Sequence, residues 1–372
     1  MPTVAPVALY FHRLSQAGGA ERMICEMANA LSGHGINVHI MSLDSSGAQS
    51  FYPIGSSVTW HRLGSSAGVL GKLRRVQQMA TIMHRHGVRV LIGFVMSGDK
   101  TVYTASRVAG VRLVAAERNG PSIYRIRYAR WQRWLTFALL HLCDAITVQF
   151  PEYIQGYPKS LRKHITCIAN PVGAARSAAR PELPGSDGRF HLLAVGRLDA
   201  IQKRFDCLIK AFSCVSHSRP EWDLEIIGEG EHEPDLRKLA ADLGLTDRVT
   251  FHAPTAQIHD AYANAHLFVM PSRWEGFSNA LAEALSSGLP AVGFRDAEGV
   301  AQLIADGSSG WLAGPGDETL ALANALNQAM SNGDERRRRG MIAAQKMRKY
   351  EPEKQYRIWA SLIERIASER IL

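Results

Sequence analysis

The chain has 372 residues and a net charge of +9, and 46% of its residues are hydrophobic. This length suits two domains with full hydrophobic cores, and the composition is that of a soluble globular protein. No stretch approaches 18 uninterrupted apolar residues, and the N-terminus lacks the basic start of a signal peptide, so we expect neither a transmembrane helix nor a cleaved leader.

The charge is distributed unevenly along the chain. Residues 1–186 hold 21 Lys and Arg against 8 Asp and Glu, which gives +13, whereas residues 187–372 hold 22 against 26, which gives −4. A basic half of this kind implies contact with an anionic surface or ligand, for which nucleic acid and the inner face of a membrane are both candidates. The five scattered cysteines contain no C-x-x-C pair, which favours a reducing cytosol and no structural metal.

Up to about Phe150, apolar runs alternate with amphipathic stretches. The runs that predict strands lie at 7–11, 36–43, 88–95, 111–116 and 144–150. Between them, stretches such as 21–32 repeat apolar residues at helical spacing. This alternation predicts a parallel sheet with helices on both faces.

The second half repeats the pattern after a linker. Residues 170–189 are rich in Pro, Gly, Ala and Ser. Predicted strands follow at 190–196, 222–228, 248–252, 265–270 and 289–294, and the chain ends in an amphipathic helix that is expected to return to the first domain. We therefore predict an α/β protein of two doubly wound domains facing each other across a cleft, with residues 1–169, the linker 170–189, residues 190–352 and the returning helix 353–372.

The loops at the carboxyl ends of such strands are where ligands bind. After the first strand, Gly18 and Gly19 open a helix and let the backbone approach a ligand closely. After the strand at 190–196, Arg197 and Lys203 flank the next turn and would neutralise a diphosphate. A tight turn and a solvated basic turn, each without a ligand, are the alternatives. Gly228 and Gly230, after a later strand, are interpreted as structural, with a place for Gly228 near the base or ribose as the alternative.

The stretch 270–288 holds two glutamates, Glu275 and Glu283, on either side of a predicted loop-to-helix transition. Ser278 is expected to cap this helix, whose N–H groups and dipole favour phosphate. Carboxylates accept hydrogen bonds from adjacent hydroxyls, such as those of sugars and ribose. Together with the neighbouring loops, the glutamate pair predicts a nucleotide-sugar pocket.

Four motifs taken together resemble the retaining glycosyltransferases of family 4, which have the GT-B fold: GGAER, VGRL with a downstream lysine, GEG, and EGFSNALAEALSSGLPAV. The resemblance spans essentially the whole chain and is most specific in residues 190–295. AAERNGP and the basic segment after it are most similar to enzymes that extend polyprenyl-diphosphate-linked oligosaccharides, such as the N-acetylgalactosaminyltransferases of bacterial N-glycosylation. The resemblance implies an acceptor-binding, membrane-facing first domain and a nucleotide-sugar-binding second domain.

The resemblance also implies a role for each residue of the donor site. Glu275 is expected to position the donor sugar through its hydroxyls, Glu283 to bind the ribose diol, and Arg197 and Lys203 to bind the diphosphate. The other expected donor contacts are Gly19 of the first domain and the segment Gly276, Phe277, Ser278 and Asn279. The family needs no cofactor and no divalent metal, and this chain has no D-x-D motif.

One segment departs from the family pattern. Many members have a histidine after the fourth core strand that contacts the transferred sugar, whereas this chain has Glu117, Arg118 and Asn119, with Arg118 at the histidine's position. We expect these three residues and Gly18 near the acceptor's lipid diphosphate. Alternatively, Arg118 pairs with Glu117 or with the acidic second domain.

Residues 121–142 predict one basic, aromatic, amphipathic helix that begins at Pro121. Its basic residues alternate with tyrosines and tryptophans, as in interfacial membrane segments; they are Arg125, Arg127, Arg130 and Arg133. Their guanidinium groups would equally bind a lipid-linked diphosphate. A buried helix with its arginines reaching solvent is the alternative; nucleic-acid binding lacks a supporting motif. We expect a cytoplasmic protein attached peripherally to the inner face of the membrane.

We interpret the chain as an enzyme that moves a HexNAc or hexose from a nucleoside-diphosphate sugar, most simply UDP-linked, to a polyprenyl-diphosphate-linked saccharide in bacterial glycan assembly. A GDP-mannose-dependent mannosyltransferase, a nucleotide-sugar epimerase and a non-catalytic nucleotide-sugar-binding scaffold are the alternatives. The missing glycine fingerprint and Walker sequence argue against a nicotinamide dehydrogenase and an NTPase.

Overall fold

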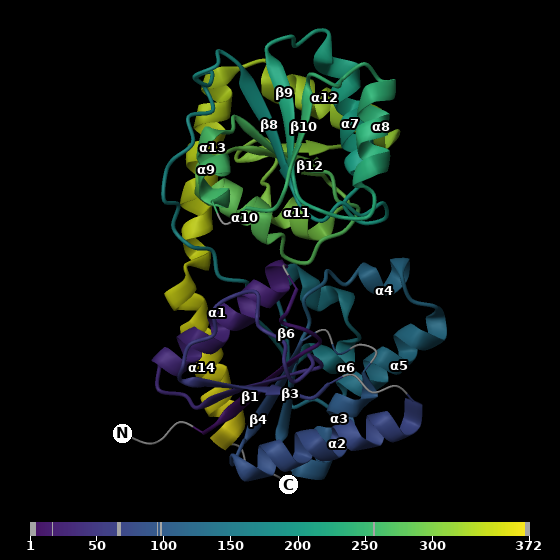
Figure 1. The fold of residues 1–372 in the computed structure, drawn as a ribbon, viewed down its shortest axis with the longest axis vertical. Helices are drawn as coiled ribbons and strands as arrows, with labels where there is room; N and C mark the ends of the chain where they lie inside the picture. The colour runs from purple at the N-terminus through teal and green to yellow at the C-terminus, as the bar shows by residue number, and fades with distance from the viewer. Residues whose placement is uncertain are drawn as a thin grey trace. The chain divides into compact units, whose positions relative to one another are not determined.

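The computed structural model describes residues 5–16, 18–64, 68–94, 96, 99–255 and 257–368. The chain divides into two compact units, residues 1–171 with 352–372 and residues 172–351. We call them the first and the second domain. In the described part of each domain, a parallel β-sheet carries helices on its faces (Figure 1).

The first domain is built on a sheet with the strand order β3-β2-β1-β4-β5-β6-β7. Each strand pairs with its neighbours in parallel. The strands are β1 (Val7–Phe11), β2 (Val38–Ser42), β3 (Val58–Arg62), β4 (Val90–Phe94), β5 (Arg112–Ala116), β6 (Ala145–Val148) and β7 (Ile165–Cys167). All residues of β1, β2 and β4 are buried, as expected for strands covered on both faces.

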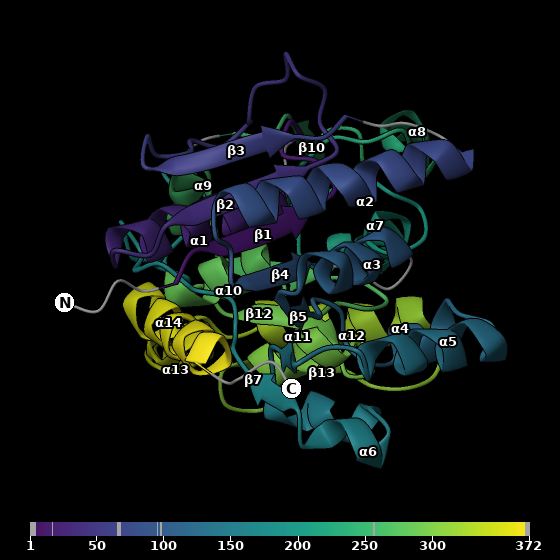
Figure 2. The same cartoon turned by 90° about the horizontal axis from the view of Figure 1, so that it is seen from below.

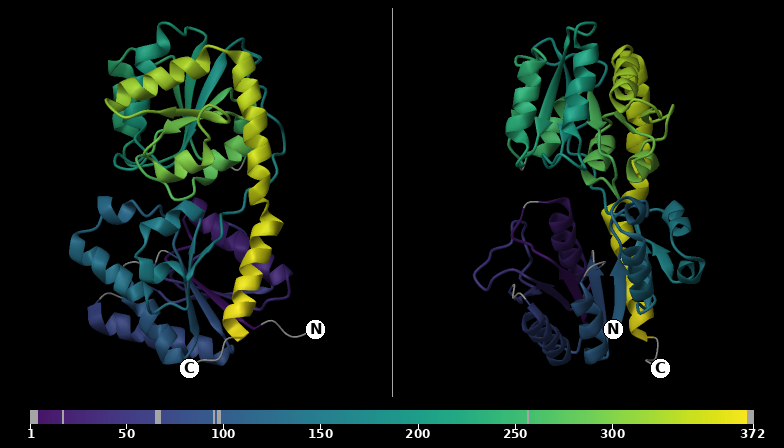
Figure 3. Two further views of the ribbon diagram at one scale, coloured as in Figure 1. Left: turned by 180° about the vertical axis from the view of Figure 1, so that it is seen from behind. Right: turned by 90° about the vertical axis from the view of Figure 1, so that its right-hand side faces the viewer.

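One face of this sheet is covered by α1 (Gly19–Gly33) and by α14 (Pro352–Ser368), at the far end of the sequence. Alternate residues of β1, Val7, Leu9 and Phe11, belong to one hydrophobic cluster with both helices. Trp359 and Ile363 of α14 are almost completely buried in that cluster. The helix at the C-terminus is therefore part of the first domain, as the sequence predicts, and both views of Figure 3 show it running along that domain.

The helices α2 (Gly68–Arg85) and α3 (Lys100–Ala109) pack against each other and lie on the other side of the sheet from α1 and α14 (Figure 2). Tyr10 of β1 points to this side, where its hydroxyl donates to Asp99 at 2.6 Å. Four short helical elements complete the domain: α4 (Ile123–Ile126), α5 (Arg130–Leu140), η1 (Pro151–Gly156) and α6 (Lys159–Arg162).

The second domain has the strand order β10-β9-β8-β11-β12-β13, again with parallel pairs. Its strands are β8 (Phe190–Val195), β9 (Trp222–Ile227), β10 (Val249–His252), β11 (Leu267–Met270), β12 (Ala291–Phe294) and β13 (Gly310–Ala313). The chain runs outward from β8 in one direction and then from β11 in the other. The order therefore reverses between β8 and β11, which is the topological switch point where such sheets bind ligands.

The helices of the second domain are α7 (Phe205–Ser216), α8 (Glu233–Asp242), α9 (Ile258–Asn264), α10 (Asn279–Ser286), α11 (Glu298–Leu303), α12 (Glu318–Met330) and α13 (Gly333–Met347), followed by η2 (Arg348–Tyr350). In α7 the buried residues recur on one face of the helix. This is the period-3.6 pattern that a helix packed on a sheet requires.

The two doubly wound domains confirm the predicted fold class, but the segment 121–142 corrects one expectation. It does not form one helix starting at Pro121; α4 and α5 are separated by residues 127–129, where Ala129 has an extended backbone (φ −59°, ψ 155°). The Ala129 N–H is capped by the Gln132 side chain at 2.9 Å, which starts α5 afresh. Among the described residues, no helix combines the length and the apolar character needed to cross a membrane.

Candidate functional site

The loops that follow β8 and β11 are joined to each other at the switch point of the second sheet. The Arg273 N–H donates to the Gln202 carbonyl oxygen at 2.8 Å, and Gln202 Nε2 donates to the Trp274 carbonyl oxygen at 3.2 Å. Two parallel strands next to each other place their following loops at one edge, and these bonds hold the two loops together there.

An ion pair links the same loops through their side chains. Lys203 Nζ lies 2.6 Å from Glu275 Oε1, with the two side chains 15% and 10% exposed. The pair is therefore mostly shielded from water, so its electrostatic attraction is stronger than that of a surface pair. The structure brings together two residues that lie 72 positions apart in the sequence and that the sequence analysis placed on one ligand.

The turn from β8 into α7 is held by Asp199, whose Oδ1 accepts from the backbone N–H groups of Gln202 at 2.7 Å and Lys203 at 3.2 Å. Arg204, which follows, has φ +53°, an uncommon conformation for a side-chain-bearing residue, and its guanidinium pairs with Glu318 at 2.5 Å. Arg197 is exposed, and its guanidinium has no hydrogen-bond or ion-pair partner among the described residues. Its cation is available to a ligand at this edge.

The glycines of the GEG sequence are explained by close backbone packing. A Cβ atom on Gly228 would lie 1.9 Å from the Gly196 carbonyl oxygen, and one on Gly230 would lie 2.4 Å from that of Leu198. The Leu198 N–H also donates to the Glu229 carbonyl oxygen at 2.9 Å. The loop after β9 therefore supports the loop after β8, which is a structural role.

The helix α10 begins where the sequence predicts, with Ser278 in the N-cap position (φ −76°, ψ 99°). Its side chain makes no capping hydrogen bond. Ser278 is 3% exposed, and its backbone carbonyl oxygen accepts the Ala282 N–H at 2.9 Å.

The Glu275–Gly276 peptide is packed from behind by α11. A Cβ atom on Gly299 would lie 2.1 Å from the Gly276 carbonyl oxygen, so only a glycine fits at that position of α11. Phe277, next in the loop, is 7% exposed and meets the Tyr350 ring edge-on, with 5.2 Å between ring centroids. The loop that carries Glu275 is therefore fixed before any ligand arrives. Asn279 is the first residue of α10.

Glu283 lies in the second turn of α10, partly buried, and accepts a hydrogen bond from the Tyr262 hydroxyl at 3.2 Å. Tyr262 on α9 was not among the predicted site residues. No local motif marks it, because its partner lies 21 residues further on. Asp199 and Gln202 were missed for another reason: they act through the backbone of the loop that they stabilise.

In the first domain, Gly18 precedes α1 and Gly19 begins it. A Cβ atom on Gly18 would lie 2.1 Å from Glu21 Oε2, so the glycine leaves room for that carboxylate. Earlier in the same loop, the Leu14 N–H and the Ser15 hydroxyl donate at 2.8 Å and 2.6 Å to the buried Asp44, which follows β2. Burial alone would raise the pKa of Asp44, but these hydrogen bonds outweigh it and lower the pKa.

Glu117 and Arg118 are engaged within the first domain. Glu117 is 6% exposed and accepts a hydrogen bond from the Tyr124 hydroxyl, and burial raises the pKa of its carboxyl. Arg118 donates to Thr147 Oγ1 at 3.0 Å and to Asn170 Oδ1 at 3.2 Å, beside the rings of Phe94 and Trp359. Burial lowers the pKa of Arg118 to about 10. These bonds hold both side chains in the domain interior, and Asn119 follows partly buried.

The basic residues of α4 and α5 lie at the surface. Arg125, Arg127 and Arg130 are exposed and Arg133 is partly exposed. Trp131 and Trp134 of α5 are 66% and 71% exposed, whereas the Tyr124 ring packs inside against Phe137. The segment thus divides into an inner aromatic side and an outer side of arginines and tryptophans.

Comparison with known proteins finds a family match in the second domain. Residues 189–332 match the family model described as glycosyl transferases group 1. We call this matched range the group 1 domain. This range holds the ion pair of Lys203 and Glu275 together with Arg197 and Glu283. The side chains described for the first domain lie outside it.

Two curated relatives extend the similarity to most of the chain. An uncharacterized glycosyltransferase of Haemophilus influenzae is 25% identical over 314 residues, 82% of this chain and 85% of that protein. The amylovoran biosynthesis glycosyltransferase AmsD of Erwinia amylovora is 23% identical over 94% of this chain and 97% of its own length. Both alignments include the first domain as well as the group 1 domain.

A solved structure defines the fold of the whole chain. HepE of Anabaena, in complex with UDP and glucose, superposes with a TM-score of 0.77 at 16% identity, over 97% of this chain and 100% of that one. The chain therefore has the GT-B fold, in which two Rossmann-like domains precede a C-terminal helix.

Proposed function

We propose that this protein is a retaining glycosyltransferase of family 4 that transfers a hexosyl or N-acetylhexosaminyl group from a nucleoside-diphosphate sugar to a polyprenyl-diphosphate-linked saccharide. The observation that carries the proposal is the Lys203–Glu275 pair, which joins the loops after β8 and β11 at the switch point of the group 1 domain. The neighbour that binds UDP and glucose supports a UDP-linked donor, and the relative named for amylovoran biosynthesis supports a role in polysaccharide assembly.

In the proposed mechanism the bond between the sugar's anomeric carbon and the diphosphate oxygen breaks, and a bond to the acceptor's hydroxyl oxygen forms on the same face. The acceptor's proton passes to an oxygen of the departing phosphate. Negative charge grows on the diphosphate during this step, so cations at that position stabilise the transition state more than the ground state. Arg197 and Lys203 are the cations that we assign there.

The remaining donor contacts follow from the loop after β11. Glu275, held by Lys203 in a rigid loop, accepts hydrogen bonds from sugar hydroxyls and orients the donor. The backbone of residues 276–279 binds sugar and phosphate, and Glu283 binds the ribose diol. The reaction as proposed needs no metal ion, because the arginine and the lysine neutralise the diphosphate.

We further propose that the first domain attaches to the anionic inner face of the membrane, where a lipid-linked acceptor resides. The exposed Trp131 and Trp134 beside basic residues have the composition of an interfacial segment. A second exposed set, Val69, Leu70 and Leu73, lies at the start of α2, and Figures 1 and 2 show α2 and α5 extending to the same side of the domain. Lys72 and Arg74 are exposed between and beside these apolar residues.

The decisive experiment incubates the protein with a panel of UDP- and GDP-linked sugars and a membrane lipid extract, and reads the products by mass spectrometry. Transfer of one sugar to a polyprenyl-linked species supports the proposal and names the donor. Conversion of the nucleotide sugar without any acceptor product would support the epimerase instead. Binding of a nucleotide sugar without turnover would support the non-catalytic scaffold. Transfer from GDP-mannose alone would show that the donor is GDP-linked and not UDP-linked.

The membrane proposal is tested separately by sedimentation with anionic vesicles. Changing Arg130 and Arg133 to Gln removes two charges worth about 1 kcal/mol each near an anionic surface, so we expect the partition coefficient to fall roughly thirty-fold. The matched control changes Lys210 and Lys238 of the second domain to Gln and should bind like the wild type. Equal binding by both variants would contradict the assigned surface.

A further inference from the structure

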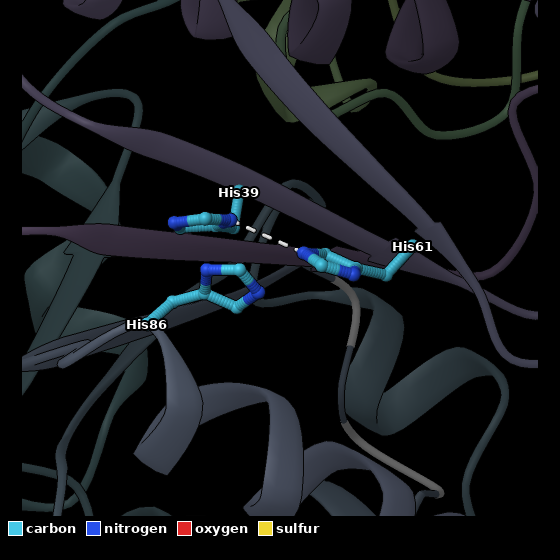
Figure 4. A group of neighbouring side chains, drawn as sticks. All are labelled: His39, His61 and His86. Carbon is cyan, nitrogen blue, oxygen red and sulfur yellow. Dashed lines mark hydrogen bonds between the residues drawn. The ribbon is translucent and has the colours of Figure 1, made fainter.

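A cluster of three histidines lies in the first domain. His39 is the second residue of β2, His61 belongs to the edge strand β3, and His86 follows the end of α2. Figure 4 shows the three rings gathered between the strands and the helix. One ring nitrogen from each histidine lies within 4.8 Å of the other two.

The rings are in direct contact. His39 Nδ1 lies 3.1 Å from His61 Nε2, and the ring centroids of His39 and His86 are 4.4 Å apart. His39 is 2% exposed, while His61 and His86 are partly exposed. The site is therefore closed at its inner end and open to solvent at its outer end, so an ion has a path to it.

We propose that His39, His61 and His86 bind one divalent transition-metal ion of the zinc type. Imidazole nitrogen is a preferred ligand of Zn²⁺, with Zn–N distances of about 2.0–2.1 Å, which places ligand nitrogens about 3.3 Å apart in a tetrahedron. The His39–His61 separation already matches this value, and His86 reaches it by a small side-chain movement. Water supplies the fourth ligand from the open side.

The position of the site indicates a structural role. β3 is the edge strand of its sheet and is half exposed, so it is held less firmly than the buried strands. A metal bound to β2, to β3 and to the residue after α2 would tie this edge to the helix that covers it. The site is distinct from the proposed donor site, which lies in the second domain, and so does not depend on that proposal.

The test is a titration of the untagged full-length protein with Co²⁺, whose visible absorption reports tetrahedral coordination and which Zn²⁺ should displace. We expect one Co²⁺ per chain in the wild type and at least roughly a hundred-fold weaker binding in His61→Ala and in His86→Ala, because even the loss of a group behind a ligand weakens binding 10–100-fold. Both replaced histidines are partly exposed, so these variants should keep the fold, which circular dichroism checks.

His84→Ala is the matched control, because His84 is exposed at the end of α2, two residues before His86. It should bind Co²⁺ like the wild type, and Zn²⁺ should raise the melting temperature of both proteins but not of His61→Ala. Absence of Co²⁺ binding by the wild type, or binding unchanged in His61→Ala and His86→Ala, would overturn the proposal.

Discussion

At the scale of single residues, we expect the replacement of Lys203 to have a large effect on turnover. Lys203→Ala should lower turnover about 10²–10³-fold, the loss seen when one preorganised donor to a developing negative charge is removed. Arg197→Ala should also slow the reaction, although it leaves the Glu275 pair intact. The measurement is steady-state transfer with saturating acceptor, and Lys238→Ala, an exposed lysine on α8, is the control. Near-normal turnover in both Arg197→Ala and Lys203→Ala would remove the diphosphate assignment.

The two replacements should also differ in how they combine with Glu275→Gln. Lys203 and Glu275 form one ion pair, so the free-energy costs of Lys203→Ala and Glu275→Gln should be strongly non-additive. The costs of Arg197→Ala and Glu275→Gln should be closer to additive. A double-mutant cycle on kcat/KM separates the two cases. Additive losses for Lys203 and Glu275 would mean that the pair acts as two independent groups.

A histidine in the second domain gives a pH prediction for stability. His191 pairs with Glu225 at 2.9 Å and with Asp187 at 3.2 Å, and the bond to Glu225 is the main cause that raises the pKa of His191 above its ordinary value of 6.5. The neighbouring His266 has its pKa lowered to about 4 by burial, so it stays neutral near pH 7. A raised pKa in the folded state stabilises the fold below the unfolded pKa, and this stabilisation is lost as the pH rises through the folded pKa.

The difference in unfolding free energy between the wild type and His191→Gln should therefore be largest near about pH 6 and should shrink by about pH 8.5. Urea unfolding at both pH values measures it. Asp187 and Glu225 are ionised throughout this range, since both have lowered pKa values. A difference that grows with pH would show that His191 contributes as a neutral hydrogen-bonding group instead.

At the scale of elements, the sequence predicts the buried strands well and the edge strands poorly. β1 and β4 are buried throughout, and their unbroken apolar runs predict them. The edge strand β3 is VTWHR with mostly half-exposed or exposed residues, and β7 has only three residues, so neither stands out from a loop. β13, at the edge of the second sheet, begins with Gly310, whose Cβ would collide with the Ala291 carbonyl oxygen at 2.4 Å.

The segment 121–142 was misread for a physical reason. Helical spacing of arginines and aromatics is consistent with one long helix, but the burial of Tyr124 against Glu117 turns α4 into the domain and forces a break before α5. The same lack of a local signal hides the three histidines, whose spacings of 22 and 25 residues belong to no metal motif. By contrast, Lys203 and Glu275 were found because each lies in a strand-to-helix loop whose position the alternation predicts.

The C-terminal helix α14 gives a prediction at this scale. Trp359 is 2% exposed, lies 6.3 Å from the Phe94 ring and fills the face of the first sheet next to α1. Trp359→Ala should lower the unfolding free energy of the first domain by about 3–5 kcal/mol, as large-to-small core replacements do. Chemical denaturation measures it, with the exposed Trp134→Ala as the control. An effect below about 1 kcal/mol would mean that α14 is not needed for the first domain's stability.

At the scale of the whole molecule, the charge asymmetry makes a prediction about how the chain meets its acceptor. The first half carries +13 and the second half −4, so an anionic membrane should attract the half that holds α2 and α5 and not the half that holds the group 1 domain. Salt shortens the range of this attraction from about 10 Å at 0.1 M to about 3 Å at 1 M. Binding to anionic vesicles should therefore weaken steeply as salt is added.

The same addition of salt should distinguish an effect on membrane binding from an effect on the transfer reaction. Turnover on a lipid-linked acceptor in anionic vesicles should fall with rising ionic strength, whereas turnover on a short soluble analogue should change much less, because the Lys203–Glu275 pair is largely shielded from solvent. Vesicles of zwitterionic lipid provide the control and should bind weakly at every salt concentration. Salt-independent binding, or equal binding to both lipids, would assign the attachment to Trp131 and Trp134 rather than to the basic residues around them.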